Sequence, residues 1–148
     1  MAKTGPEAAL RAYLTRRIGF TAEHRYYRED WSPEENARVF GDAAKPEFHS
    51  HDYLCDVTVT GSVDGPSGML MDLAELDAVL RREVRDRFDG RRINLEVPEF
   101  RDGGLVPSCE VLARFLFDRI QAALGSRARL ESVVMRESDT LSAEVRRN

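Results

Sequence analysis

The pattern that decides the fold lies in residues 49–63, HSHDYLCDVTVTGSV. Apolar and polar side chains alternate along this stretch, and a period of two is typical of a β-strand with one buried face. One face would carry Tyr53, Cys55, Val57 and Val59, and the other Leu54, Asp56, Thr58 and Thr60. Gly61, Gly65, Pro66 and Gly68 follow, and these residue types are typical of turns. We therefore predict a strand over Ser50–Val63.

Weaker patterns on both sides of this strand complete a β-β-α-α-β-β order. Residues 23–48 read as a long loop with a helical turn over 34–39, whereas apolar residues recur every three to four positions after Asp72 and after Pro107-Ser108. The predicted elements are strands 13–21 and 50–63, helices 72–88 and 107–124, and strands 130–135 and 141–145. This order predicts an α+β fold, a four-stranded antiparallel sheet with two helices on one face.

The composition is that of one ordinary domain. The chain has 148 residues, with 22 Lys and Arg against 26 Asp and Glu and a net charge of −4. We expect a flexible leader over residues 1–10 and a single domain over 11–148. The acidic balance argues against a nucleic-acid partner, and no run of about 20 apolar residues predicts a membrane span. Two cysteines without CxxC spacing favour a reducing, cytoplasmic location.

The three histidines suggest a metal site. His49 and His51 form an H-x-H pair, and alternation along a strand places both imidazoles on one face. His24 follows the preceding strand and would supply a third nitrogen. Three protein ligands with an open fourth position are typical of catalytic zinc. The spacing alone leaves open the alternative that the three are ordinary surface or core histidines.

Several short motifs follow one another along the chain. They are IGFTAEHR (18–25), EEN (34–36), FG (40–41), Pro46, HSHDY (49–53), GMLMDL (68–73), FD (88–89), Asn94, VP (97–98), Phe100, PSCE (107–110) and LA (112–113). From about Thr15 to Val145 this series resembles the family of 6-pyruvoyltetrahydropterin synthase and 6-carboxytetrahydropterin synthase. The resemblance implies a tunnelling fold, in which sheets from several subunits close into an oligomeric barrel, as a homotrimer or a homohexamer.

The same resemblance implies a set of site residues. Zn²⁺ would be held by His24, His49 and His51, and the pterin ring of a small-molecule substrate such as 7,8-dihydroneopterin triphosphate by Glu110 and Glu137. A carboxylate can accept two parallel hydrogen bonds from such a ring edge. Without the resemblance, Glu110 reads as an acidic residue in the first turn of a helix and Glu137 as a solvated turn residue.

The chain departs from the family at the groups that move protons. Where the family has a catalytic cysteine, this chain has Ala43, and where the family pairs Asp with His, Asp89 is followed by Gly90. The metal histidines are separated by Ser50 in place of the usual glycine and followed by Asp52 in place of asparagine. Loss of each proton-transfer group would cost about 10²–10⁴-fold in rate.

The groups that remain for proton transfer are Asp89 and, as a substitute for the cysteine, Glu47. Cys109 is a further thiol near the predicted pocket, although it also reads as a packing residue, and Cys55 reads as core.

Three functions are consistent with these residues. The first is a zinc-dependent, pterin-synthase-like lyase acting on a dihydroneopterin-type or related bicyclic substrate with altered proton-transfer residues. The second is a non-catalytic homologue that binds metal and a pterin or purine. A third is a fold retained only for assembly.

Overall fold

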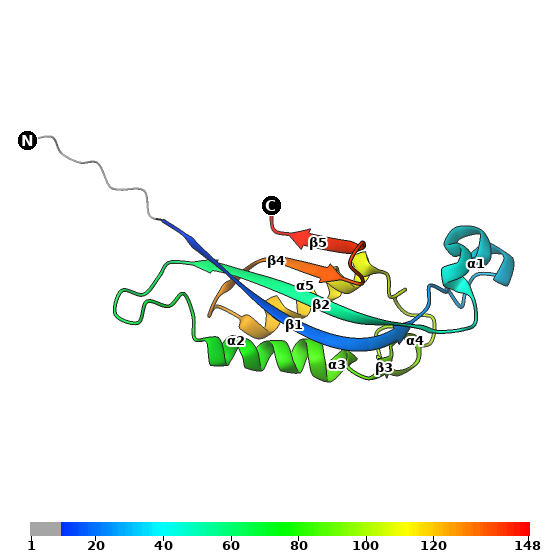
Figure 1. Cartoon of the computed structure of the whole chain (residues 1–148), viewed down its shortest axis with the longest axis horizontal. Coiled ribbons are helices and arrows are strands. Elements are labelled where there is room, and N and C mark those ends of the chain that lie inside the picture. Colours follow the sequence, from blue (N-terminus) through cyan, green and yellow to red (C-terminus); the bar gives the residue numbers. More distant parts are fainter. Residues whose placement is uncertain (1–9) are drawn as a thin grey trace, which may run out of the picture.

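The computed structural model describes residues 10–148 and consists of one sheet with its long helices on one side (Figure 1). The predicted leader over 1–10 falls outside the described residues except for Leu10. The strands are β1 (Ala12–His24), β2 (His49–Gly61), β3 (Arg91–Arg92), β4 (Arg129–Arg136) and β5 (Ser142–Arg146), in the order β3-β1-β2-β4-β5. The four long strands pair antiparallel, as predicted, and β3 adds a short parallel edge to β1 that the sequence analysis missed.

The two long helices predicted from the sequence begin and end at the residues that the sequence marks, and a short helix at Ile93–Glu96 is an addition. They are α1 (Pro33–Phe40) with a 3₁₀ turn (Gly41–Ala44), α2 (Leu73–Leu80), a π-helical turn (Arg81–Arg85), α3 (Asp86–Phe88), α4 (Ile93–Glu96) and α5 (Cys109–Leu124). Asp72 and Ser108 cap α2 and α5 by accepting from backbone amides, and α5 is followed by Gly125, whose φ is 57°. The segment from α2 to α3 is the single helix predicted over 72–88, with one π-helical turn inside it.

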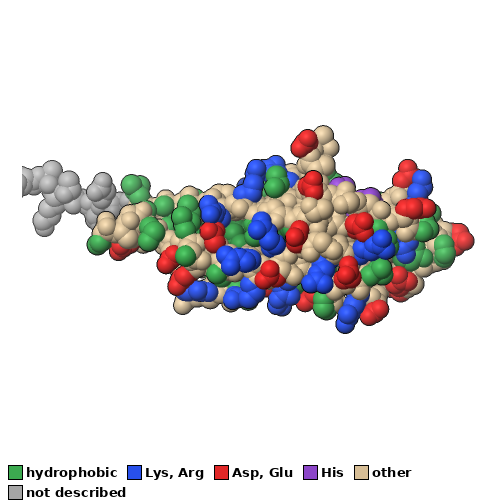
Figure 2. Space-filling model, turned by 60° about the horizontal axis from the view of Figure 1, so that its bottom comes forward, with side chains coloured by type: hydrophobic (Ala, Val, Ile, Leu, Met, Phe, Trp, Pro, Cys, Tyr) green, Lys and Arg blue, Asp and Glu red, His purple; other side chains and the backbone are tan. Residues whose placement is uncertain are grey.

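The core lies between the sheet and the two long helical segments. β2 buries the face predicted for it, Tyr53, Cys55, Val57 and Val59, in one core cluster with α5 residues that include Leu112, Leu116 and Ile120. The prediction of two helices on one face of the sheet is therefore confirmed. Outside the core, Figure 2 shows Arg and Lys side chains interleaved with Asp and Glu over the lower side of Figure 1.

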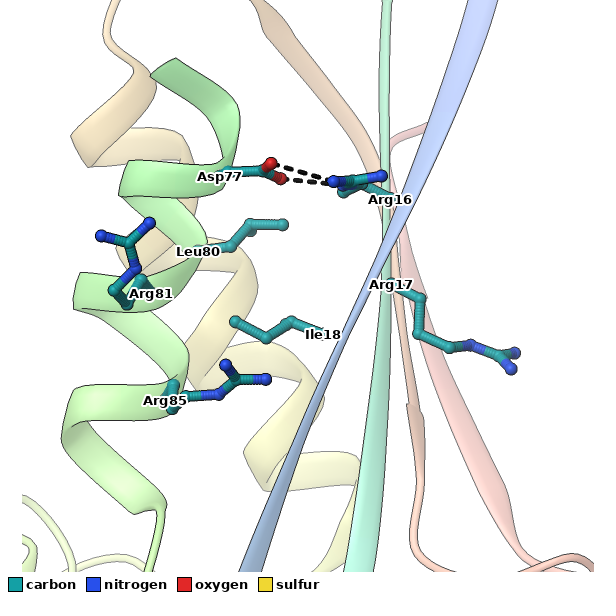
Figure 3. A pocket seen from close by; sticks show the side chains of 7 residues that line it. All are labelled: Arg16, Arg17, Ile18, Asp77, Leu80, Arg81 and Arg85. Atoms are coloured by element: carbon teal, nitrogen blue, oxygen red, sulfur yellow. Dashed lines mark hydrogen bonds and ion pairs between the residues drawn. The ribbon is translucent and has the colours of Figure 1, made fainter. Parts of the chain in front are cut away.

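Ion pairs on the surface connect the elements on both faces of the sheet. Arg16 of β1 makes two hydrogen bonds to Asp77 of α2, at 2.8 and 2.9 Å, and so joins the helix to this strand (Figure 3). On the opposite face of the sheet, Asp56 accepts from Arg17 at 2.6 Å and from Arg136 at 3.3 Å. Within residues 10–148, no helix combines the length and apolar character needed to cross a bilayer.

The register of β1 and β2 positions the candidate site. The hairpin pairs His24 with His49 and Ala22 with His51. β1 therefore continues three residues past the predicted end at Thr21, because the start of β2 supplies backbone partners as far as His24. All three histidines consequently lie at one end of the sheet.

Candidate metal centre

The three imidazoles meet at the end of the β1–β2 hairpin. The ring centroid of His24 lies 4.5 Å from that of His49 and 5.0 Å from that of His51, and the rings of His49 and His51 are 5.1 Å apart. His24 is fully buried, whereas His49 and His51 are half-buried. The structure thus brings together the three residues that the sequence analysis proposed as ligands.

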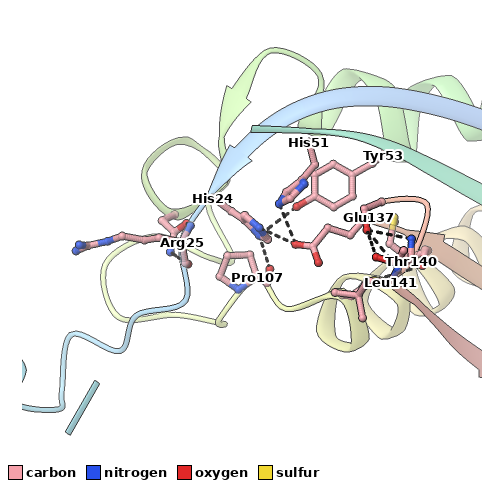
Figure 4. Close-up of polar contacts among 12 residues, drawn as sticks. His24, Arg25, His51, Tyr53, Pro107, Glu137, Thr140 and Leu141 are labelled. Atoms are coloured by element: carbon pink, nitrogen blue, oxygen red, sulfur yellow. Dashed lines mark hydrogen bonds and ion pairs between the residues drawn. The ribbon is translucent and has the colours of Figure 1, made fainter. Parts of the chain in front are cut away.

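Glu137 reaches the same point from the turn after β4. Its Oε1 lies 2.8 Å from Nε2 of His24 and 3.2 Å from Nε2 of His51 (Figure 4). The turn is fixed because the Glu137 amide donates to Leu141 O, and Ser138 Oγ accepts from the amides of Thr140 and Leu141. One potential ligand atom from each of the four residues lies within 4.8 Å of the others.

The orientation of His24 is set from the side away from this cluster. Its Nδ1 lies 2.8 Å from the carbonyl oxygen of Pro107, and a carbonyl can only accept, so Nδ1 carries the proton. The hydroxyl of Tyr53 lies 3.1 Å from the same Nδ1. These two contacts turn Nε2 toward His51 and Glu137, the arrangement that orients metal-binding histidines in proteins.

The buried nitrogens of the cluster fit a cation. Nε2 of His24 and Nε2 of His51 are buried and have no aligned hydrogen-bond partner among the described residues, although Oε1 of Glu137 is close to both. Ligand atoms of a tetrahedral zinc ion, at about 2.0–2.1 Å from the metal, lie roughly 3.3 Å from one another. The separations of 2.8 and 3.2 Å are near that value. The donor set therefore fits a divalent metal ion.

The protonation states favour the same interpretation. Burial, followed by the neighbouring imidazoles, lowers the pKa of His49, while the charge of Glu137 opposes this. Burial likewise lowers the pKa of His51, so both rings are neutral at pH 7. The close contact with His24 is the main cause that lowers the pKa of Glu137, so its side chain is a carboxylate. Neutral imidazoles and a carboxylate are the forms that bind metal.

The other predicted site residues lie outside this cluster. Glu110 is exposed in the first turn of α5, and Glu47 is exposed in the loop before His49. Asp89, also exposed, accepts a hydrogen bond at 2.9 Å from the backbone amide of Thr21, at the edge of β1. Asp89 thus has a structural partner three residues from His24.

The two cysteines are poor candidates for a thiolate. Cys109 donates through Sγ to the carbonyl of Met135 at 3.3 Å, and burial is the main cause that raises its pKa to about 11. Cys55 is buried in the core, and burial raises its pKa to about 12. Both are therefore thiols at neutral pH.

Sequence reasoning missed the two groups that orient His24. Tyr53 lies on the same strand face as His51, two residues further on, and this spacing was a signal that could have identified it. The carbonyl of Pro107 gave no such signal, because any residue provides a carbonyl. The sequence also provided no indication of the direct contact between Glu137 and the histidines.

Together, the fold and the cluster define a tunnelling-fold protein with a candidate metal centre of three histidines and a glutamate. Residues 13–148 match the family model described as 6-pyruvoyl tetrahydropterin synthase. The chain belongs to this family.

Individual relatives agree with this assignment. The 6-pyruvoyl tetrahydrobiopterin synthase of Homo sapiens is 35% identical over 124 residues, 84% of each chain. The enzyme of the same name from Dictyostelium discoideum is 34% identical over 111 residues, 75% of this chain and 79% of the relative.

Solved structures show the same fold. The 6-pyruvoyl tetrahydropterin synthase of Caenorhabditis elegans superimposes with a TM-score of 0.87 at 27% identity, covering 94% of this chain and 97% of the other. A Plasmodium vivax 6-pyruvoyltetrahydropterin synthase, described as a catalytic-residue mutant with glutamate replaced by cysteine, superimposes with a TM-score of 0.67 at 16% identity. It covers 94% of this chain and 99% of its own, and at this identity it supports the fold alone.

Proposed function

We propose that this protein is a zinc-dependent lyase of the pterin-synthase type that acts on a dihydroneopterin-like substrate. The observation that carries the proposal is the convergence of His24, His49, His51 and Glu137, with potential ligand atoms within 4.8 Å of one another. The names of the relatives support pterin chemistry. Zinc is proposed over other divalent ions because three imidazoles suit it and leave a position for a substrate oxygen.

The roles of the side chains follow from their chemistry. His24, His49 and His51 would hold the ion, which when bound supplies a Lewis acid for the oxygens of the substrate side chain. Glu110 and Glu137 would hold the ring by accepting hydrogen bonds from its amino group and ring N–H. Glu137 also faces two of the histidines, so it would fix the distance between the ring and the metal.

Proton transfer is proposed for Asp89 and Glu47. Glu47 is exposed, and in the described part of the chain its side chain has no ion pair, so it is free to move toward a ligand. The Plasmodium vivax relative, in which a glutamate is described as a catalytic residue, supports the idea that a carboxylate serves this fold. One oxygen of Asp89 accepts from Thr21, which would hold the carboxylate in place.

The alternative is a non-catalytic homologue that binds metal and a pterin or purine. Two residues favour it, Ala43 and Gly90, which provide no side chain able to move a proton. In either case we propose a small-molecule ligand, a homotrimer or homohexamer, and a cytoplasmic location.

The test is turnover by the metal-loaded protein. The protein is loaded with one equivalent of zinc, incubated with 7,8-dihydroneopterin and with its triphosphate, and the pterin products are separated by chromatography. We expect a new pterin product that is absent from His49→Ala under the same conditions. Binding of either compound without product, in the wild type, would support the alternative function. If the wild type neither binds these compounds nor forms a product, pterin chemistry is contradicted altogether.

A further inference from the structure

A groove between β1 and the helical segment from α2 to α3 has no role in the proposed function. It encloses about 230 Å³ and is called the β1–α2 groove below. The residues that line it are Arg16, Arg17, Ile18, Asp77, Leu80, Arg81 and Arg85 (Figure 3). Ile18 and His24 are six residues apart on β1, a separation of about 20 Å in an extended strand. The groove is therefore a different site from the candidate metal centre.

The arginines that follow α2 divide into two kinds. Arg82 and Arg87 lie against the buried carboxylate of Glu83, at 3.3 and 2.9 Å. Arg81 and Arg85 line the groove instead, and neither forms an ion pair with any residue of the described chain. A π-helical turn contains both of them, and such turns are frequent at functional sites. The turn thus leaves two guanidinium charges without a carboxylate on the side that faces β1.

Hydrogen bonds hold the walls of the groove in place. Arg85 extends from the helix toward β1, where its Nε and Nη2 donate to the carbonyl oxygen of Gly19 at 3.3 and 3.2 Å (Figure 3). A carbonyl accepts hydrogen bonds but has no net charge, so the charge of Arg85 is not balanced. Closer to the start of α2, the two hydrogen bonds from Arg16 fix Asp77, the carboxylate that lines the groove.

The floor of the groove is apolar. Leu80 is 1% exposed and Ile18 is half-buried. Arg17 adds no free charge, because its guanidinium pairs with Asp56 on the opposite face of the sheet, at 2.6 Å. The excess charge is therefore that of the two arginines of the π-helical turn. Guanidinium groups match the oxygens of phosphate, and a phosphate monoester carries a charge of about −1.5 to −2 at neutral pH.

We propose that the β1–α2 groove binds a small phosphate monoester, with the phosphoryl group between Arg81 and Arg85 and the organic part over Ile18 and Leu80. Its volume is below the roughly 300–1,000 Å³ typical of pockets for drug-sized ligands, so the ester is small. The chain has a net charge of −4, which disfavours contact with an anionic lipid surface, so the ester is a soluble one. The site depends on neither zinc nor a pterin.

Two ligands and three variants test this inference by isothermal titration calorimetry of the zinc-loaded protein. Inorganic phosphate measures binding of the anion alone, and phenyl phosphate adds a small apolar body. Arg81→Gln removes one charge from the groove. Arg82→Gln is the matched control, because it changes the net charge equally in the same turn while its guanidinium pairs with Glu83. Asp77→Asn removes the carboxylate of the groove. Zinc content and circular dichroism are measured for every protein.

We expect the wild type to bind phenyl phosphate about 3- to 10-fold more tightly than inorganic phosphate, because the ring covers the apolar floor. Arg81→Gln should weaken the binding of both ligands about 10-fold, the range for one hydrogen bond to a charged group, with zinc content unchanged. Arg82→Gln should stay within about 2-fold of the wild type. Asp77→Asn should bind phenyl phosphate more tightly, a gain that a damaged fold would not produce.

Four results would overturn the inference. They are equal affinities of the wild type for the two ligands, absence of binding, unchanged affinity in Arg81→Gln, and an equal loss in Arg81→Gln and Arg82→Gln. Unchanged affinity in Arg81→Gln would place the phosphate elsewhere, for example at the zinc ion. Sedimentation of the protein with vesicles that contain phosphatidic acid would assign the phosphate to a lipid and would also contradict a soluble ester.

Discussion

Two buried glutamates of this molecule have nearly the same exposure and very different neighbours. Glu83 is 7% exposed and Glu137 is 6% exposed. Glu83 lies in the π-helical turn, 2.9 Å from Arg87, 3.3 Å from Arg82 and 3.5 Å from Arg119. Glu137 instead lies against imidazole nitrogens that have no aligned hydrogen-bond partner among the described residues.

The comparison separates a carboxylate with a structural role from one that faces the candidate metal site. Arginines remain charged at any pH that the protein meets, so the chain itself provides the positive charge that Glu83 needs. Around Glu137 the half-buried imidazoles have lowered pKa values and are neutral at pH 7. A metal ion would complete the charge balance at Glu137, whereas Glu83 requires nothing from outside.

The largest effect is expected from removal of a histidine. His49→Ala deletes one of three proposed nitrogen ligands and should lower zinc affinity more than about 100-fold, beyond the loss typical of residues that only orient a ligand. Competition with a chromophoric chelator measures the affinity. Cys55 and Cys109 are buried thiols and should not replace the lost ligand. Unchanged affinity in His49→Ala would mean that zinc binds elsewhere.

Exchange of each glutamate for glutamine tests directly whether the two residues have different roles. Glu83→Gln should lower the free energy of unfolding by about 1–3 kcal/mol, between the values for exposed and fully buried ion pairs, and leave zinc affinity unchanged. Glu137→Gln should lower zinc affinity at least about 10-fold and change the unfolding free energy of the metal-free protein by less than about 1 kcal/mol. Urea unfolding and zinc titration of both variants provide the four values. The comparison fails if the two variants show the same pattern.

The two regions should also differ in their response to acid. The pKa of His49 and of His51 is lowered in the folded protein, so protonation favours unfolding, and stability falls as the pH drops below about 6.5. Burial raises the pKa of Glu83, but Arg87, Arg82 and Arg119 together outweigh it and lower the pKa. Stability from Glu83 is therefore present above about pH 4.3 and lost at lower pH.

A pair of titrations separates these two responses. Zinc should dissociate as the pH falls below about 6.5, while circular dichroism still reports a folded chain, and unfolding should follow in the range where carboxylates protonate. Zinc release and unfolding at a single pH would contradict the separation of the two regions.

The smallest effect is expected from the group behind His24. Tyr53→Phe removes the hydroxyl near Nδ1 but keeps the ring that stacks on Phe20, so the fold should be retained. Zinc affinity should fall by only about 10-fold, because the carbonyl of Pro107 still accepts from Nδ1 of His24. Tyr13→Phe, at an exposed position, serves as the control. An affinity in Tyr53→Phe equal to that of the control would show that the Pro107 carbonyl alone orients the ring.

Much of the fold could be predicted because its signals are local. Alternation in residues 53–59 identifies β2, and Asp72, Ser108 and Gly125 mark helix ends by capping. β3, with two residues, and α4, with four, are too short for periodicity to reveal.

The site residues likewise divide into those that a local pattern predicts and those that depend on contacts between distant segments. The H-x-H spacing is local and sufficient to bring His49 and His51 to one face, and the β1–β2 register then adds His24. The position of Glu137 against these rings depends on how the turn after β4 approaches the hairpin. The hydrogen bond from Thr21 to Asp89 likewise depends on contact between distant segments. Sequence patterns do not encode such approaches.

We propose that three histidines hold a metal ion at the end of the β1–β2 hairpin. The most direct measurement is the zinc K-edge X-ray absorption spectrum of the zinc-loaded protein, compared with that of His49→Ala. We predict a first shell of nitrogen and oxygen at about 2.0–2.1 Å with multiple scattering from three imidazoles, reduced in the variant. A shell containing sulfur at about 2.3 Å, or a spectrum without imidazole scattering, would contradict the claim.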